Sequence, residues 1–346
     1  MLTARRLLCS MLGGLLLWPA TACAADPIED FYKAKTVRIV VGYGVGGGYD
    51  AYARLIARHL GRHIPGSPTV IVQNMAGAGT LTAALHVAAI APQDGTTIGA
   101  IDAALPFLPL LDPAQTRFDP LQQNWLPSPV TDTALVIVWH TAPVTRIDEA
   151  REKEILLASS SPNATSSYYA RVLNDVLKTK FRIVLGYASA TESLLAMERG
   201  EVHGFPSMPW STLKSTRPDW IRDGRLKYLV QFGARRHPEV PAATPFAPDL
   251  ISDPADRALL DLVVAPAKLG KPYMLGAGVP PERVAAMRAA FAAALKDDQL
   301  IADADKQHLE LDPHAPSGEQ VGQLLARTFA APPELRARLQ ALYAAK

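Results

Sequence analysis

The order of apolar and polar positions along the first part of the chain predicts alternating strands and helices. Short β-branched runs that end at glycine or amide residues predict buried strands, and apolar residues at helical spacing predict helices between them. Strands are predicted over residues 36–41, 70–72 and 97–101, and helices over 50–60 and about 80–89. This alternation is typical of a parallel sheet with right-handed crossover connections.

A second series of the same kind follows the proline-rich stretch from Leu105 to Pro129, which lacks clear periodicity. A late helix over 281–295 has Pro281 at a position that suits a helix start. No sequence repeat is detectable, but two α/β series indicate two similar lobes. The other elements predicted here are strands over 134–139, 155–158, 182–186 and 227–232, and helices over 167–177 and 192–199.

The N-terminus has the features of a secretory signal peptide. Arg5 and Arg6 precede an apolar run that is too short to span a membrane, and small residues surround Ala24. Residues 1–24 are therefore the predicted leader, which makes the protein an exported one that acts in the periplasm. A lipid anchor at Cys23 is the alternative, and Ala20 disfavours it because lipoprotein signals usually have leucine there.

Composition limits the classes of partner. The chain is 49% hydrophobic and 20% charged, which is typical of a globular protein and not of a disordered one. The formal net charge is +2, and both excess charges are leader arginines, so the exported chain is formally neutral. A neutral protein has no bulk electrostatic attraction to nucleic acid or to an anionic membrane, and we expect neither as a partner. Both cysteines also lie in the leader, so no disulfide is expected.

Three turns between a predicted strand and the following helix are rich in glycine or small hydroxyl residues. They cover residues 44–49, 77–80 and 159–166. A helix N-terminus offers unpaired N–H groups, and the carboxyl ends of parallel strands share one edge of a sheet. The turns therefore predict an anion-binding site, although each could also be an ordinary connection whose glycines serve backbone geometry. Aromatic residues that are candidates for the rim of a cleft are Tyr43, Tyr49, Tyr187 and Trp210.

Patterns for catalysis, cofactors or metals are incomplete. Residues 42–47 fit the glycine fingerprint of dinucleotide sites, but the second strand ends at Asn74 without the carboxylate that holds a ribose. His59 and His63 have a metal-ligand spacing, but Gly61 interrupts it and no third ligand is near. We expect no catalytic residue, no metal and no cofactor.

Several segments together resemble one known family. Residues 40–54 resemble the strand, G-G-x-x-D and A-R opening of the Bug family, the periplasmic solute-binding proteins of tripartite tricarboxylate transporters. Residues 70–79 are similar to its V-x-N-x-x-G-A-G segment, and residues 91–97 to its A-x-x-D-G-x-T segment. Weaker similarities over 186–202 and 278–284 extend the resemblance over nearly all of the exported chain.

The resemblance implies an α/β protein with a two-lobed Venus-flytrap fold, in which each lobe is a mainly parallel sheet flanked by helices. Residues 25–127 and 233–346 would form the first lobe, and residues 128–232 the second. It implies a monomeric, non-catalytic protein that captures a small carboxylate between the lobes and delivers it to integral membrane permease subunits. A sensor that presents its bound solute to a membrane signalling protein is the alternative.

Ligand-binding residues are carried over from the family by position. Asp50 has two interpretations. It could be a helix cap, or it could belong to the site, where it would order the glycine loop or accept an ammonium or hydroxyl group of the ligand. The turn 160–165 lacks the glycines that the family has there, and Ser189 stands where the family has a further glycine. The loops are therefore bulkier, and we expect a ligand that differs from citrate. The candidates are Gly47, Gly48, Asp50, Ala78, Gly79 and Thr80 in the first lobe, and Ser160, Asn163, Thr165, Ser166 and Ser189 in the second.

Overall fold

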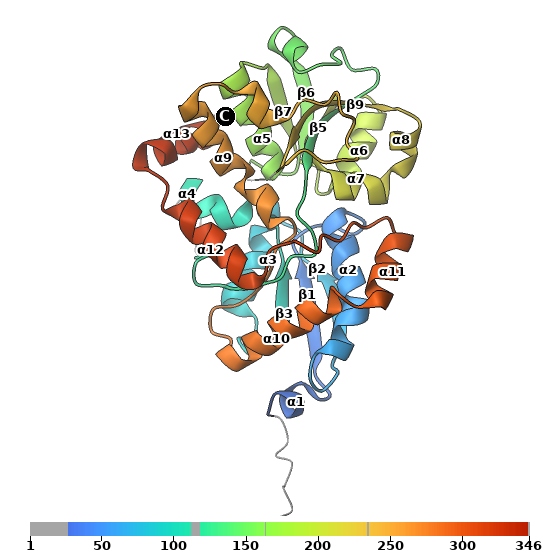
Figure 1. The fold of residues 1–346 in the computed structure, drawn as a ribbon, viewed down its shortest axis with the longest axis vertical. Coiled ribbons are helices and arrows are strands. Elements are labelled where there is room, and N and C mark those ends of the chain that lie inside the picture. The colour runs from blue at the N-terminus through green and yellow to red at the C-terminus, as the bar shows by residue number, and fades with distance from the viewer. Residues whose placement is uncertain (1–26, 112–117, 163, 234, 345–346) are drawn as a thin grey trace, which may run out of the picture.

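The computed structural model describes residues 27–111, 118–162, 164–233 and 235–344. The predicted leader, residues 1–24, lies outside them. The described chain forms two lobes, each built around one five-stranded sheet. Figure 1 shows the lobes one above the other, with helices around each sheet. No helix in the described part of the chain is long and apolar enough to cross a membrane.

The first sheet has the strand order β2-β1-β3-β10-β4. Its first three strands are parallel, and β10 runs antiparallel to both β3 and β4. The strands are β1 (Thr36–Val41), β2 (Thr69–Asn74), β3 (Thr97–Ala100), β4 (Asn124–Leu126) and β10 (Tyr273–Leu275). The helices are α1 (Pro27–Tyr32), α2 (Gly48–Leu60), α3 (Leu81–Leu85), α4 (Leu108–Leu111), α10 (Pro281–Ala294), α11 (Asp298–Lys306) and α12 (Gly318–Phe329), with short helical turns η1 (Gly61–His63), η2 (Ala78–Thr80), η3 (His86–Ile90) and η4 (Leu105–Phe107).

The second sheet has the strand order β7-β6-β8-β5-β9. β6 is parallel to β7 and β8, whereas β5 is antiparallel to β8 and β9, so both sheets are mixed. The strands are β5 (Ala134–Trp139), β6 (Ile155–Ser159), β7 (Phe181–Leu185), β8 (Gly204–Pro209) and β9 (Leu226–Phe232). The helices are α5 (Thr165–Leu177), α6 (Ala190–Glu198), α7 (Trp210–Thr216), α8 (Pro218–Arg222), α9 (Pro254–Leu269) and α13 (Pro333–Ala344), with short turns η5 (Asp148–Arg151) and η6 (Ala247–Leu250).

The apolar pattern predicted best two strands that are mostly or wholly buried. β1 and β5 have the predicted bounds, and every residue of β5 is buried. The pattern missed β8, which contains Pro206, a residue that argues against a strand. β8 pairs with β5 nevertheless, because a register shift between Leu135 and Ile137 accommodates the irregular segment.

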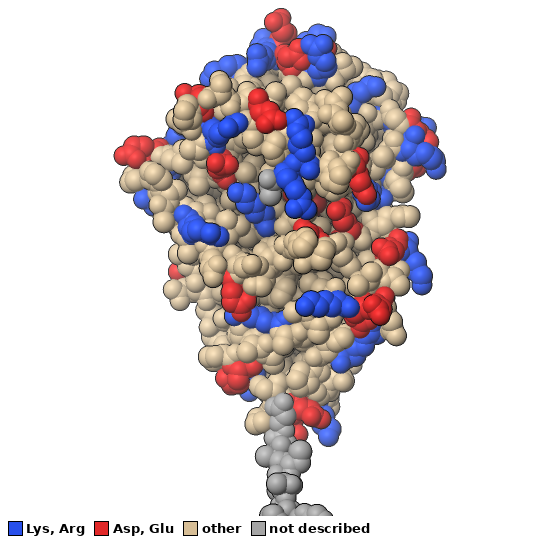
Figure 2. Space-filling view, in the orientation of Figure 1, with Lys and Arg blue, Asp and Glu red and all other residues tan. Residues whose placement is uncertain are grey.

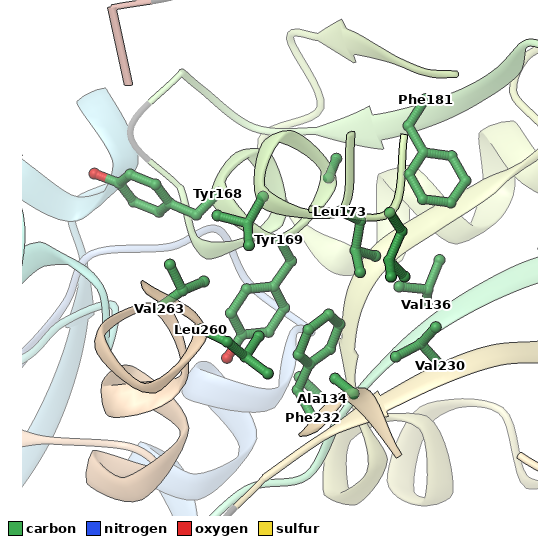
Figure 3. Packing of buried hydrophobic residues seen from close by; sticks show 14 of the residues in the cluster. Ala134, Val136, Tyr168, Tyr169, Leu173, Phe181, Val230, Phe232, Leu260 and Val263 are labelled. Carbon is green, nitrogen blue, oxygen red and sulfur yellow. The ribbon is translucent and has the colours of Figure 1, made fainter. Parts of the chain in front are cut away.

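The long helix α9 joins the cores of the two lobes. Leu259, Leu260, Val263 and Val264 pack in the main hydrophobic cluster of the second lobe, whereas Leu269 packs in a cluster of the first. Figure 3 shows residues of α5, α9 and the second sheet in this second-lobe cluster.

The segment before α9 also stays with the second lobe. The sequence placed the return to the first lobe after residue 232, but the N–H of Gln231 donates to Pro245, and Ala247 and Ile251 join the second-lobe cluster. Leu339 of α13 packs there as well. The packing therefore favours a lobe boundary inside α9, because the chain continues to bury apolar residues against the second sheet.

Two crossings between the lobes lie side by side, at residues 127–133 and 266–272. The N–H of Asp132 donates to the carbonyl of Ala267 at 3.2 Å, and the N–H of Lys271 donates to Ser128 Oγ at 3.1 Å. Gly270 has a φ of +65°, and a Cβ there would lie 1.6 Å from the carbonyl oxygen of Val130. The close approach of the two segments therefore needs glycine at this position.

Charged side chains of both signs are spread over the face shown in Figure 2, on both lobes. This mixed distribution agrees with the formal neutrality expected of the exported chain.

Candidate ligand-binding site

A cavity lies between the lobes. Its lining comes from both lobes and from the two crossings. The residues are Tyr43, Gly47, Gly48, Tyr49, Asp102 and Ala103 of the first lobe; Asp132, Ala134, Pro266, Ala267 and Gly270 at or near the crossings; and Ser160, Ser166, Tyr169, Tyr187, Ser189, Ala190, Ser193, Phe205, Ser207, Pro209 and Thr212 of the second lobe.

The glycine loop brings the N-terminus of α2 to the cavity. Gly47 precedes the helix in an extended conformation, and no side chain caps the N–H groups of the first turn. Both Gly47 and Gly48 line the cavity. Uncapped N–H groups at a helix N-terminus carry partial positive charge, so this turn can donate hydrogen bonds to an anion.

Asp50 is buried below this loop, outside the cavity lining. Its carboxylate accepts hydrogen bonds from the N–H of Gly46 at 3.0 Å, from Arg54 Nε at 3.0 Å and from Asn74 Nδ2 at 2.9 Å. Burial raises the pKa of Asp50, but these donors outweigh it and hold the pKa below its ordinary value. In the described geometry Asp50 orders the glycine loop, which is one of its two predicted roles.

The second glycine turn, η2, also lies outside the cavity lining. Ala78, Gly79 and Thr80 have φ values of +47°, +61° and +74°. The hydroxyl of Thr80 accepts a hydrogen bond from the N–H of Asp102 at 2.9 Å. The turn therefore holds the end of β3, from which Asp102 enters the cavity.

The second lobe contributes hydroxyl groups from the turns before α5 and α6. Ser160 and Ser166 line the cavity, and Ser166 Oγ lies 2.6 Å from Ser159 Oγ. Ser189 lines it too and caps α6, because its hydroxyl accepts the N–H of Glu192 at 3.2 Å. Thr165 is the first residue of α5, and its side chain is not among those described; Asn163 lies outside the described residues.

The aromatic candidates divide into two groups. Tyr43, Tyr49 and Tyr187 line the cavity, whereas Trp210 is buried in the second lobe, where its Nε1 donates to Glu239 at 3.0 Å. The sequence reasoning missed Tyr169, Asp102 and Asp132. Asp102 follows β3 at the edge of the sheet where the turns were expected, and that position could have indicated it; Tyr169 and Asp132 have no comparable signal.

Two carboxylates face the cavity, and neither is isolated. Asp132 forms an ion pair with Lys271, whose ammonium also donates to Ser211 Oγ at 3.0 Å. Asp102 accepts hydrogen bonds from the hydroxyl of Tyr43 and from the N–H of Ala104. Burial and the charge of Asp102 raise the pKa values of Tyr43 and Tyr49 well above the ordinary value, so both hydroxyls stay protonated.

The lobes also touch each other beside the cavity. The hydroxyl of Thr191 donates to the carbonyl of Gly46 at 3.1 Å. A Cβ at Gly48 would lie 2.1 Å from Thr212 Oγ1, so the start of α2 meets α7 with no room for a side chain. The structure therefore has the lobes closed on one another at this point.

The lining offers neutral donors in place of cations. Among its described residues there is no lysine, arginine or histidine. Within the described ranges, no group of three histidine, cysteine, aspartate or glutamate side chains could hold a metal ion. An anion bound here would be held by main-chain N–H groups and hydroxyls.

No known protein-family profile matches the chain. A curated relative, the "UPF0065 protein in gbd 5'region" of Cupriavidus necator, is 25% identical over 236 residues, which are 66% of this chain and 67% of the relative.

Solved structures match over most of the chain. The periplasmic binding protein BugD has a TM-score of 0.67 at 17% identity, covering 89% of this chain and 97% of BugD. MatC from Rhodopseudomonas palustris, solved with bound malate, has a TM-score of 0.67 at 20% identity, covering 89% of this chain and 98% of MatC. The chain thus has the two-lobed fold of the periplasmic binding proteins, as the resemblance to the Bug family implied, and BugD is among its structural neighbours.

Proposed function

We propose that this protein is a periplasmic solute-binding protein of the Bug type. It captures a small carboxylate between its lobes and delivers it to the membrane subunits of a tripartite tricarboxylate-type permease. The observation that supports this most strongly is the cavity, which lies between two lobes that touch and whose lining includes the glycines at the start of α2 and several serine residues. The malate in the name of MatC, a structural neighbour, is a carboxylate of the expected kind.

The carboxylate would bind where helix N-termini meet the cavity. α2 and α5 begin without a side-chain cap, after Gly47 and Ala164 respectively. Their first N–H groups lack partners within the helix, and their dipoles favour a negative charge. The hydroxyls of Ser160, Ser166 and Ser189 can add further donors.

Capture would combine binding with closure of the lobes. The two crossings beside Gly270 are the connection about which the lobes can move, and the contact between Gly46 and Thr191 forms only when they are closed. A solute that contacts both lobes binds the closed state more tightly, and therefore shifts the population toward it. We assign no catalytic step, metal or cofactor to this cycle.

Thermal melting of the purified protein with a panel of carboxylates at about 1 mM tests the capture step. A ligand with a Kd near 1 µM adds about 4 kcal/mol to the free energy of unfolding by mass action. We expect a clear rise in Tm with one chemical class of carboxylate. If no carboxylate raises the Tm and none binds by calorimetry, the proposed function is wrong.

Uptake separates delivery from sensing. Cells that lack this protein should lose uptake of the solute found by melting and regain it with the wild-type gene. If uptake is unchanged while a transcriptional response to the solute disappears, the protein is a sensor that presents its ligand to a membrane signalling protein.

A further inference from the structure

A buried lysine lies next to the wall of the cavity, outside its lining. Lys271 belongs to the second crossing, and its side chain is 1% exposed. Its ammonium group forms an ion pair with Asp132 of the first crossing and donates to Ser211 Oγ of α7 at 3.0 Å. The ammonium also lies 5.6 Å and 4.8 Å from the ring centroids of Tyr49 and Tyr52 in α2. Both lobes and both crossings therefore enclose this positive charge.

Asp132 is the residue of the cavity wall that this lysine holds. It lines the cavity, although its side chain is only 10% exposed. Its Oδ2 pairs with the ammonium of Lys271, and its Oδ1 accepts a hydrogen bond from Ser211 Oγ at 2.7 Å. Both carboxylate oxygens thus have a partner outside the lining, and the negative charge at the wall is compensated by a positive charge in contact with it.

Stability alone does not explain a charged pair at this place. Taking an ammonium and a carboxylate out of water costs free energy, and a buried ion pair is often no better for stability than well-packed apolar residues of similar volume. Main-chain hydrogen bonds, such as that from the N–H of Asp132 to Ala267, join the crossings independently of the pair. The charge of Lys271 has a different consequence. Without it, Asp132 would present an uncompensated negative charge to the cavity, and like charges repel strongly in a buried site.

We propose that Lys271 is a positioning residue that allows an anion to bind in the cavity. It acts through Asp132, whose carboxylate it neutralises and holds, and it does not itself contact the solute. This inference rests on the proposed function, because only a negatively charged solute gains from the compensation. The lining contains no lysine, arginine or histidine among its described residues, so the cation that offsets its acidic wall residue lies just outside it.

Removing the two charges separately and together tests this inference. Calorimetry measures the affinities of the wild type, Lys271→Met, Asp132→Asn and the double variant for the carboxylates of the melting panel, with malate, succinate and adipate among them. Lys271→Met leaves Asp132 uncompensated, and we expect the best-bound carboxylate to bind about 10- to 100-fold more weakly. Asp132→Asn should bind it at least as tightly as the wild type does. The double variant should recover most of the affinity that Lys271→Met loses. Asp102, the other carboxylate of the lining, is the same in all four proteins.

The Tm of each variant without ligand separates charge from packing. Both single variants leave a buried charge unpaired and should have a lower Tm, and the double variant should regain stability. Asp132→Asn is therefore decisive, also if Lys271→Met does not fold. Its stability should fall while its affinity does not, whereas a pair that only supported the packing would lose both. Lys296→Met and Asp298→Asn make the same changes of charge at exposed positions around the start of α11 and should leave the affinities unchanged.

The outcomes distinguish this inference from the proposed function. A carboxylate that binds the wild type and Lys271→Met equally well would show that the charge of Lys271 does not matter for binding. Weaker binding by Asp132→Asn, or a double variant that binds no better than Lys271→Met, would show that the pair acts through packing. In each of these cases the inference is wrong and the carboxylate carrier remains. If no carboxylate of the panel binds the wild type, the proposed function fails and this inference fails with it.

Discussion

The two glycine turns of the first lobe have the same pattern in sequence and different places in the structure. The turn over 44–49 follows β1, an inner strand, and places Gly47 and Gly48 in the cavity. The turn over 77–80 follows β2, the edge strand, and lies outside the cavity lining, where Thr80 packs against Gly42 and its hydroxyl accepts the N–H of Asp102. In this lobe, the turn after the inner strand lines the cavity, whereas the turn after the edge strand packs outside it.

The largest effect should come from filling the contact between the first turn and the second lobe. Gly48→Ala would place a methyl group 2.1 Å from Thr212 Oγ1, so the lobes could not close fully. We expect about 30- to 100-fold weaker ligand binding, which corresponds to roughly 2–3 kcal/mol, with an unchanged Tm in the absence of ligand. Calorimetry and melting measure the two quantities.

Thr212→Ala provides the matched control for that substitution. Combined with Gly48→Ala it removes the hydroxyl and methyl groups that block the lobes, although the Thr212 Cβ position remains 3.0 Å from the added methyl group. Part of the lost affinity should return in the double variant. Equal affinities for Gly48→Ala with and without the second change would show that this contact does not control closure.

Asp50→Asn should destabilise the first turn without touching the cavity. The change removes the charge that Arg54 and the N–H of Gly46 bind, and we expect the free energy of unfolding to fall by about 2–3 kcal/mol. Because folding lowers the pKa of Asp50, its contribution is present at neutral pH and is lost as the pH falls below about 4. Urea unfolding at pH 7 and pH 3 should therefore give a large difference between variant and wild type at pH 7 and a small one at pH 3. A difference that persists unchanged at pH 3 would contradict this role for the charge.

Thr80→Val tests the second turn as a support. The substitution keeps the shape of the side chain but leaves the N–H of Asp102 without its acceptor, and both groups are buried. We expect a loss of about 1–2 kcal/mol in the free energy of unfolding. The affinity for carboxylate ligands should change little, because the turn is outside the cavity lining. A large loss of carboxylate affinity at unchanged stability would mean that this turn contacts the ligand after all.

Gly47→Ala should have the smallest effect. Gly47 has an ordinary extended backbone, and no atom lies within 4 Å of an added Cβ. We expect the stability to change by less than about 0.5 kcal/mol, as for a substitution with no new contact. A strong loss of affinity would indicate that the ligand lies directly against Gly47, which would sharpen the assignment of the carboxylate to the start of α2.

Much of the fold followed from the sequence because a mostly buried strand has a mostly apolar run of residues. Continuous β-branched runs gave the bounds of β1 and β5, and helical spacing with Pro281 gave α10 to within one residue at its end. The strands β4, β8 and β10 were not predicted. β4 and β10 have only three residues each, too few for a pattern, and β8 contains prolines that a bulge accommodates.

The residues of the candidate site also divide into those that the sequence indicated and those that it did not. Gly47, Gly48, Ser160, Ser166 and Ser189 line the cavity, and the sequence could single them out because a turn at the carboxyl end of a strand is a local property of the chain. Sequence alone also determined the two α/β series, the neutral formal charge of the chain without its predicted leader and the resemblance to the Bug family. Only the tertiary structure decided that Asp50 and Thr80 lie outside the cavity lining, and that Asp102, Asp132 and Tyr169 all line one cavity. These three residues come from different lobes or crossings, and which distant segments pack together depends on strand order and lobe closure, which no local pattern encodes.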